Sequence, residues 1–207
     1  MSPKVNIAVE DRLSETVLRV LLRHARSRPV VSQSFPISKG WQTEVGPNGY
    51  GYIRKNLAAF NAGAKHTPFV VLVDADNRPC PPETIRLWLD GAVQDSNLII
   101  RVAIREVEAW LLADRLGLAS YLAVSEECIP HETTRIKDPK RYIARLAARS
   151  RRKEIRTDLA REPGTRSKTG PFFAQSLQFF VKNLWDINVA RCHSDSLNRA
   201  MIALDKL

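Results

Sequence analysis

The chain has 207 residues and a formal net charge of +10 at pH 7, with 44% hydrophobic and 26% charged residues. This length and composition are typical of a folded protein with one large core, or of a core domain with a smaller appendage. No apolar run is long enough to span a membrane, and the N-terminal segment lacks the pattern of a signal peptide, so we expect no membrane partner. The three cysteines are widely spaced and form no CxxC pair, which favours a reducing, cytoplasmic location.

The first part of the chain alternates between patterns typical of strands and of helices. The predicted strands cover residues 4–9, 28–37, 68–74 and 97–104, and the predicted helices cover residues 14–25, 53–64, 82–93 and 105–117. This alternation predicts an α/β fold over residues 1–117, with a mostly parallel sheet and flanking helices. Ser14 is the expected N-cap of the first helix, and residues 38–51 are expected to form a glycine-rich loop.

Residues 118–207 contain no convincing strand and are predicted to form a helical C-terminal region. Helices are expected at 139–150, 172–185 and 194–206, with a polar connection at 157–170. Trp110 and Trp185 are expected to be core residues. None of the four histidines has the spacing of a metal ligand.

A basic segment covers residues 135–168. It contains thirteen Lys or Arg and four Asp or Glu, and so carries nearly the whole net charge. One interpretation is a solvated helical face. We favour contact with a polyanion, because charges of one sign repel one another unless a partner offsets them; nucleic acid or an acidic protein surface would serve. The candidate nucleic-acid-binding residues are Lys140, Arg141, Arg149, Arg151, Arg152 and Lys153.

Acidic residues follow three of the predicted strands. They are Glu10 and Asp11 after the first strand, Asp74 and Asp76 at the end of the third, and Glu106 and Glu108 after the fourth. Functional groups of a parallel sheet gather at the carboxyl ends of its strands, so we expect several of these side chains at one edge. An oxygen-only cluster suits Mg²⁺ or Mn²⁺, whereas zinc would favour Cys or His ligands.

The same acids also have a structural interpretation, because Asp and Glu stabilise the first turns of helices. Asp11, Glu15 and Glu83 fit that role, whereas we favour a metal site for Glu10, Asp74 and Asp76. Glu106 and Glu108 are two residues apart on a predicted helix, so at most one should reach the metal; we expect Glu108, with Glu106 as the fallback.

The motifs that surround these acids resemble the Toprim fold. "VNIAVEDRLSETVLRVLL" resembles its first motif, a strand that ends in Glu, and "VVLVDADN" resembles its second, a strand that ends in Asp-x-Asp. "REVEAWLLAD", "IKDPKRYI" and "SDSLNRAMIAL" resemble a group of Toprim-like bacterial defence proteins related to the overcoming-lysogenization-defect nucleases. The resemblance spans most of the chain and implies a Toprim-like, Rossmann-like fold.

The resemblance also implies roles for individual residues. Glu10 takes the place of the first-motif glutamate, a metal ligand or general acid/base, and Asp74 and Asp76 take the place of the metal-binding pair. Glu108 stands in for an additional acid of the nuclease branch. The sequence departs from the pattern at three positions, where Asp11 and Asn77 replace glycines that are common in the family and Arg78 replaces a third acid.

Two main functions remain open from the sequence; a third, a nucleotidyl-transfer or primase-like activity, would use the same metal site, but the sequence shows no second nucleotide pocket. The first is a Mg²⁺- or Mn²⁺-dependent nuclease that hydrolyses DNA or RNA, the effector of an antiphage system in which an ATPase is the partner, in a homo- or hetero-oligomer. The second is a non-catalytic or conditionally active subunit that docks on an ATPase. No Walker motif is present, so any ATP dependence must come from a partner.

Two weaker signals concern phosphate binding. Lys140, in "KDPK", is a candidate phosphate contact or a solvated helix residue. Ser194, Ser196 and Arg199 fit either phosphate binding or a helix N-cap with a neighbouring ion pair.

Overall fold

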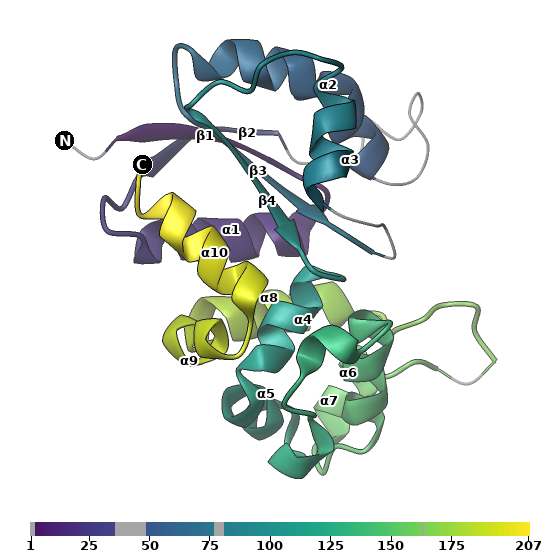
Figure 1. Ribbon diagram of the computed structural model, residues 1–207. Helices are drawn as coiled ribbons and strands as arrows, with labels where there is room; N and C mark the ends of the chain where they lie inside the picture. The colour runs from purple at the N-terminus through teal and green to yellow at the C-terminus, as the bar shows by residue number, and fades with distance from the viewer. Residues whose placement is uncertain (1–2, 36–48, 77–80, 163) are drawn as a thin grey trace. The chain divides into compact units, whose positions relative to one another are not determined.

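The computed structural model describes residues 3–35, 49–76, 81–162 and 164–207 (Figure 1). Its strands are β1 (Lys4–Val9), β2 (Val30–Phe35), β3 (Phe69–Asp74) and β4 (Leu98–Ala103). Its α-helices are α1 (Arg12–His24), α2 (Gly49–Ala64), α3 (Pro81–Trp88), α4 (Val107–Ala113), α5 (Arg115–Leu122), α6 (Pro139–Ala148), α7 (Lys153–Leu159), α8 (Phe173–Asn183), α9 (Ile187–Cys192) and α10 (Asp195–Leu204). Two short 3₁₀ helices cover Glu126–Cys128 and Thr133–Arg135.

The chain divides into two compact units. Unit 1 comprises Met1–Val102 together with Arg199–Leu207, and unit 2 comprises Ala103–Asn198. The chain therefore leaves unit 1 after β4 and returns to it within α10.

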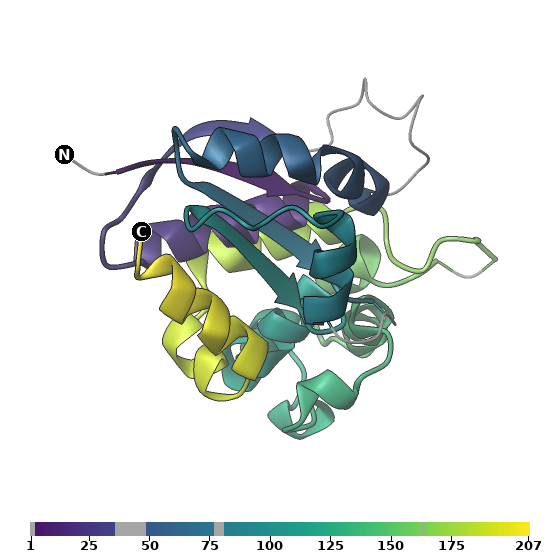
Figure 2. The ribbon, with the colours of Figure 1, turned by 45° about the horizontal axis from the view of Figure 1, so that its top comes forward.

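A four-stranded parallel sheet, in the order β2-β1-β3-β4, forms the centre of unit 1. In the register of β1 with β3, Val9 lies opposite Leu72, so β1 ends beside Leu72 and β3 continues for two more residues, to Asp74. Figure 2 shows the strands pointing in a common direction. The α/β fold with a mostly parallel sheet, predicted from the alternating pattern, is confirmed.

Helices cover both faces of this sheet, with α1 on one face and α2 and α3 on the other (Figure 1). Residues 69–73 of β3 are all buried, as expected for a strand covered on both sides. Phe69, Val71 and Val73 join one core cluster with α2 and α3, in which the Phe60 and Phe69 rings stack with centroids 4.7 Å apart. The alternation of side chains along β3 thus supplies the apolar surface for this helical layer.

Asp11, rather than Ser14, caps α1. The Asp11 carboxylate accepts a hydrogen bond of 2.8 Å from the backbone N–H of Ser14, and the helix begins at Arg12. The predicted Ser14 cap is therefore wrong, because an earlier residue already satisfies the N–H groups of the first turn. The expectation that Asp11, Glu15 and Glu83 stabilise helix starts is confirmed, with Asp11 as an N-cap and the two glutamates in first turns.

The helix predicted over residues 105–117 is two helices, α4 and α5, which meet at Asp114. The Asp114 carboxylate caps α5 by accepting the N–H of Gly117, at 3.1 Å. Gly117 therefore lies in the first turn of α5 and does not end a helix, which corrects the prediction. A Cβ at this position would overlap the Asp114 carboxylate, so the cap requires glycine there.

Other helix boundaries also differ from the predicted ones. Helix α2 begins at Gly49, inside the predicted glycine-rich loop, of which residues 38–48 lie outside the described residues. Helix α3 ends at Trp88, before Asp90 and Gly91 adopt positive φ angles of 49° and 79°. The C-terminal helices predicted at 139–150, 172–185 and 194–206 correspond to α6, α8 and α10, whereas α7 and α9 were not predicted.

Candidate functional site

The strand order of unit 1 creates a switch point between β1 and β3. From β1 the chain connects outward to β2 on one side, and later to β3 and β4 on the other side. Open parallel sheets bind ligands in the crevice at the carboxyl ends of the two strands that flank such a point. Glu10 follows the last residue of β1, and Asp74 is the last residue of β3.

A hydrogen bond joins the ends of these two strands. The Glu10 Oε1 atom accepts the backbone N–H of Asp74 at 3.0 Å, and both residues are half-buried. This bond directs the Glu10 carboxylate toward the end of β3. The structure thus brings together two of the sequence-predicted site residues, and it does so within a single unit.

Asp76 is the third acid of this edge. It is exposed and has a φ angle of +49°, while the preceding residue, Ala75, is only 8% exposed. Asp is one of the few residues besides glycine that enter the left-handed region readily, and such conformations concentrate at functional sites. The departures from the family pattern at Asn77 and Arg78 lie outside the described residues.

Glu106 and Glu108 belong to unit 2. Glu106 precedes α4, and its Oε2 atom accepts the N–H of Lys140 in the first turn of α6, at 3.0 Å. Glu108 lies in the first turn of α4 and is only 5% exposed. Glu10, Asp74 and Asp76 belong to unit 1. Neither unit by itself therefore contains the whole predicted group of metal-binding acids. Within the described ranges, no three His, Cys, Asp or Glu residues form a group that could hold a metal ion.

The candidate nucleic-acid-binding residues lie on unit 2. Arg141, Arg149, Arg151, Arg152 and Lys153 are exposed. Lys140 is half-buried, and its Nζ atom lies 5.9 Å from the centroid of the Phe173 ring, within the range of a cation–π contact. The exposed cations are thus available at the surface of unit 2, while Lys140 contributes to packing between α6 and α8.

Ser194 and Ser196 have structural roles. The Ser194 Oγ atom accepts the N–H of Leu197 at 3.4 Å, which is the geometry of an N-cap of α10. The Ser196 Oγ atom accepts the indole Nε1–H of Trp110 at 2.8 Å. Trp110 is fully buried and Trp185 is 8% exposed, so the prediction that both are core residues is confirmed.

Asp114 is a buried acid whose role the sequence analysis missed. It is 3% exposed, and besides capping α5 it accepts the N–H of Asp186, at 2.9 Å. Burial raises the pKa of the Asp114 carboxyl above its ordinary value; the two accepted hydrogen bonds oppose this rise, and the charge of Asp186 adds to it. The spacing Asp-x-x-Gly in the sequence could have indicated the cap of α5. No local sequence signal indicates the hydrogen bond to Asp186.

We expect Asp114 to make the free energy of unfolding depend on pH. Because its pKa is raised in the folded state, the folded chain binds the proton more tightly, and this contribution to stability is lost as the pH rises from about 3.8 through the raised value. The free energy of unfolding of the wild type, minus that of Asp114→Asn, should fall over this interval. Urea unfolding at a series of pH values measures it, and a constant difference would contradict the assignment.

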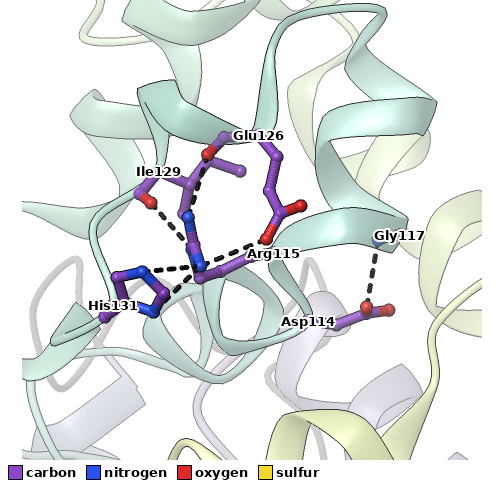
Figure 3. Close-up of polar contacts among 6 residues, drawn as sticks. All are labelled: Asp114, Arg115, Gly117, Glu126, Ile129 and His131. Carbon is purple, nitrogen blue, oxygen red and sulfur yellow. Dashed lines mark hydrogen bonds and ion pairs between the residues drawn. The ribbon is translucent and has the colours of Figure 1, made fainter.

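Arg115, next to Asp114, organises the segment that follows α5 (Figure 3). Its Nε atom donates to the carbonyl of Ile129 at 2.8 Å, and its Nη2 atom donates to the carbonyl of Glu126 at 3.3 Å. Its Nη1 atom lies 3.1 Å from the Glu126 carboxylate and 2.9 Å from Nδ1 of His131. The Arg115 guanidinium thus holds the backbone of the segment after α5 in place, which indicates a structural role for Arg115.

Comparisons with protein-family models, with curated proteins and with solved structures found no match for this chain. Among the described residues, none of the helices combines the length and the apolar character needed to span a membrane.

Proposed function

We propose that this chain is a Toprim-like, metal-dependent nuclease that hydrolyses phosphodiester bonds of DNA or RNA and works with an ATPase partner in antiphage defence. The observation that carries the proposal is the hydrogen bond between the Glu10 carboxylate and the Asp74 N–H, at the switch point of a parallel sheet. The family resemblance of the two strand-end motifs supports the same chemistry.

The donor atoms at this edge fit Mg²⁺ or Mn²⁺. Glu10, Asp74 and Asp76 offer only carboxylate oxygens, the ligands that hard cations prefer. Mg²⁺ in phosphoryl-transfer sites is commonly held by one or two protein carboxylates together with water and substrate phosphates. A closely packed group of three acids is therefore not required before the substrate arrives.

Each group then has a defined task. A bound cation would polarise the scissile phosphate and lower the pKa of a water molecule. The Asp74 N–H holds the Glu10 carboxylate at the end of β3, so that its orientation does not depend on the metal. The exposed cations Arg149, Arg151 and Arg152 would neutralise backbone phosphates, an interaction that does not depend on sequence and weakens as salt increases.

A second candidate function is a subunit whose metal site is completed by a partner. Two observations favour this second function. Glu106 accepts the Lys140 N–H and Glu108 is buried, so both acids already contribute to the structure of unit 2. In this case the isolated chain would bind metal weakly, and cleavage would require the ATPase.

The direct test is Mn²⁺ binding by titration calorimetry. We expect the wild type to bind and the double variant Asp74→Asn with Asp76→Asn to lose binding; asparagine is chosen because it also tolerates the left-handed turn at Asp76. Glu83→Gln, an exposed position in the first turn of α3, is the matched control and should bind like the wild type. No binding by the folded wild type would overturn the stand-alone metalloenzyme and leave the partner-dependent subunit.

A further inference from the structure

Unit 1 contains a pocket of about 440 Å³ beside the edge strand β4. Its walls are the turn at residues 94–97, the first residues of β4 with Arg101, Pro68 before β3, and Ala203, Lys206 and Leu207 near the end of the chain. Pro68 and Leu98 lie at the amino ends of β3 and β4. The pocket is therefore at the opposite end of the strands from Glu10 and Asp74, and its volume is in the range of small-molecule sites.

Arg101 is the unusual residue of this pocket. Its Nε atom is buried and has no hydrogen-bond partner in the structure. Burial lowers the pKa of the guanidinium, which means that the surroundings disfavour its charge. A buried donor without an acceptor costs about 1–3 kcal/mol. Because Nε is itself shielded from solvent, a ligand would meet the guanidinium through the part that lines the pocket, where a negatively charged acceptor would favour its charge.

The other charged groups of the pocket favour such an acceptor. Lys206 is exposed and adds a second cation. Asp95 is the opposing acid, but its Oδ1 atom accepts the N–H of Asn97 at 2.9 Å and so holds the turn. Gln94 also stabilises the turn, by donating from Nε2 to the carbonyl of Leu98 at 2.7 Å. Arg101 and Lys206 are therefore the two side-chain cations of the wall, and they are opposed by a single side-chain carboxylate, Asp95, which the turn already engages.

We propose that this pocket binds a small organic anion, whose phosphate or carboxylate group pairs with Arg101 and Lys206. Its apolar body would lie against Pro68, Leu98 and Ala203, which supply the apolar part of the wall. Arg offers a planar set of donors that matches either type of oxyanion. This site is separate from the acids of the proposed nuclease and does not depend on that function.

The position of the pocket gives the ligand a structural effect. Strand β4 is the last element before the chain leaves unit 1, and residues 199–207 are the segment with which it returns. A bound anion would cross-link these two segments within unit 1. Because it binds the folded chain and not the unfolded one, it should raise the midpoint of thermal unfolding.

The test uses phenyl phosphate and benzoate as probes, with phenol as the uncharged control, on the full chain. We expect titration calorimetry to detect binding of at least one anion and not of phenol, and the probe that binds identifies the preferred oxyanion. Arg101→Met should weaken this binding by about 10- to 100-fold, the effect of losing charge-assisted hydrogen bonds. Lys206→Met should weaken it by about two- to fivefold, as expected for an exposed ion pair.

Methionine keeps the apolar stem of Arg101 and removes a charge that burial disfavours, so we expect the variant to fold. The matched control is Arg54→Met, at an exposed position of α2 outside the pocket, which should bind like the wild type. The proposal is overturned if the folded wild type binds neither anion. It is also overturned if Arg101→Met and Lys206→Met both bind as tightly as Arg54→Met.

Discussion

Replacing Asp74 by asparagine is expected to reduce the proposed metal-dependent cleavage of nucleic acid by about 10²–10³-fold, the effect of removing one preorganised electrostatic group from a catalytic site. Glu10→Gln should cause a loss of the same order. Glutamine keeps an oxygen that accepts the Asp74 N–H, so the local structure should survive while the negative charge is lost. Initial rates are to be measured on single-stranded DNA, duplex DNA and RNA, and with the proposed ATPase partner where the isolated chain is inactive.

Two comparisons isolate the role of these acids. Glu83→Gln removes the same charge from an exposed position in α3 and should leave the rate unchanged. Asp76→Asn should have a smaller effect than Asp74→Asn, because Asp76 is exposed and lies beyond the end of β3. Equal rates for wild type, Glu10→Gln and Asp74→Asn, with all three folded, would exclude this edge of the sheet as the catalytic site.

Trp110→Ala is expected to lower the free energy of unfolding by about 3–5 kcal/mol, which is the range for removing a large aromatic side chain from a core. Trp110 is fully buried in unit 2, and its indole N–H donates to Ser196. Ser196→Ala keeps the ring and removes the acceptor of the indole N–H and, at 3.5 Å, of the Ile104 N–H, so we expect a smaller loss, of about 1–3 kcal/mol. Urea unfolding followed by far-UV circular dichroism measures both changes.

Trp185 provides the matched comparison. It lies in the same unit and is 8% exposed, but its Nε1–H is buried without a hydrogen-bond partner in the structure. Trp185→Phe should therefore be less destabilising than Trp110→Phe, because only the second substitution breaks a hydrogen bond. The opposite order would mean that the Trp110–Ser196 bond contributes little and that ring volume alone decides the effect.

The strands of unit 1 were predictable from local sequence. The apolar run of β3 is buried on both faces, and in an α/β protein such a run is typical of a central parallel strand. The convergence of Glu10 and Asp74 followed from the same pattern, since parallel strands place their carboxyl ends at one edge. The hydrogen bond between them depends on the register of β1 with β3, for which the sequence contains no local signal.

The predicted helix boundaries were wrong where two residues both fit the N-cap position, or where a contact distant in sequence determines where a helix ends. Both Asp11 and Ser14 are good N-caps, and the end of β1 at Val9 places the helix start at the earlier one. The apolar pattern of α4 continues into α5, so it hides the break at Asp114. That break is supported by the N–H of Asp186, far along the chain, which periodicity does not reveal.

The return of residues 199–207 to unit 1 affects how the chain folds during synthesis. The N–H of Arg26, just after α1, is accepted by Asp205 at 3.0 Å, and all of unit 2 is translated between these two residues. On the ribosome, the sheet and its helices therefore emerge first, but this contact cannot form until Asp205 has left the exit tunnel. Loop-closure entropy grows only slowly with length, so the inserted unit delays the completion of unit 1 far more than it destabilises it.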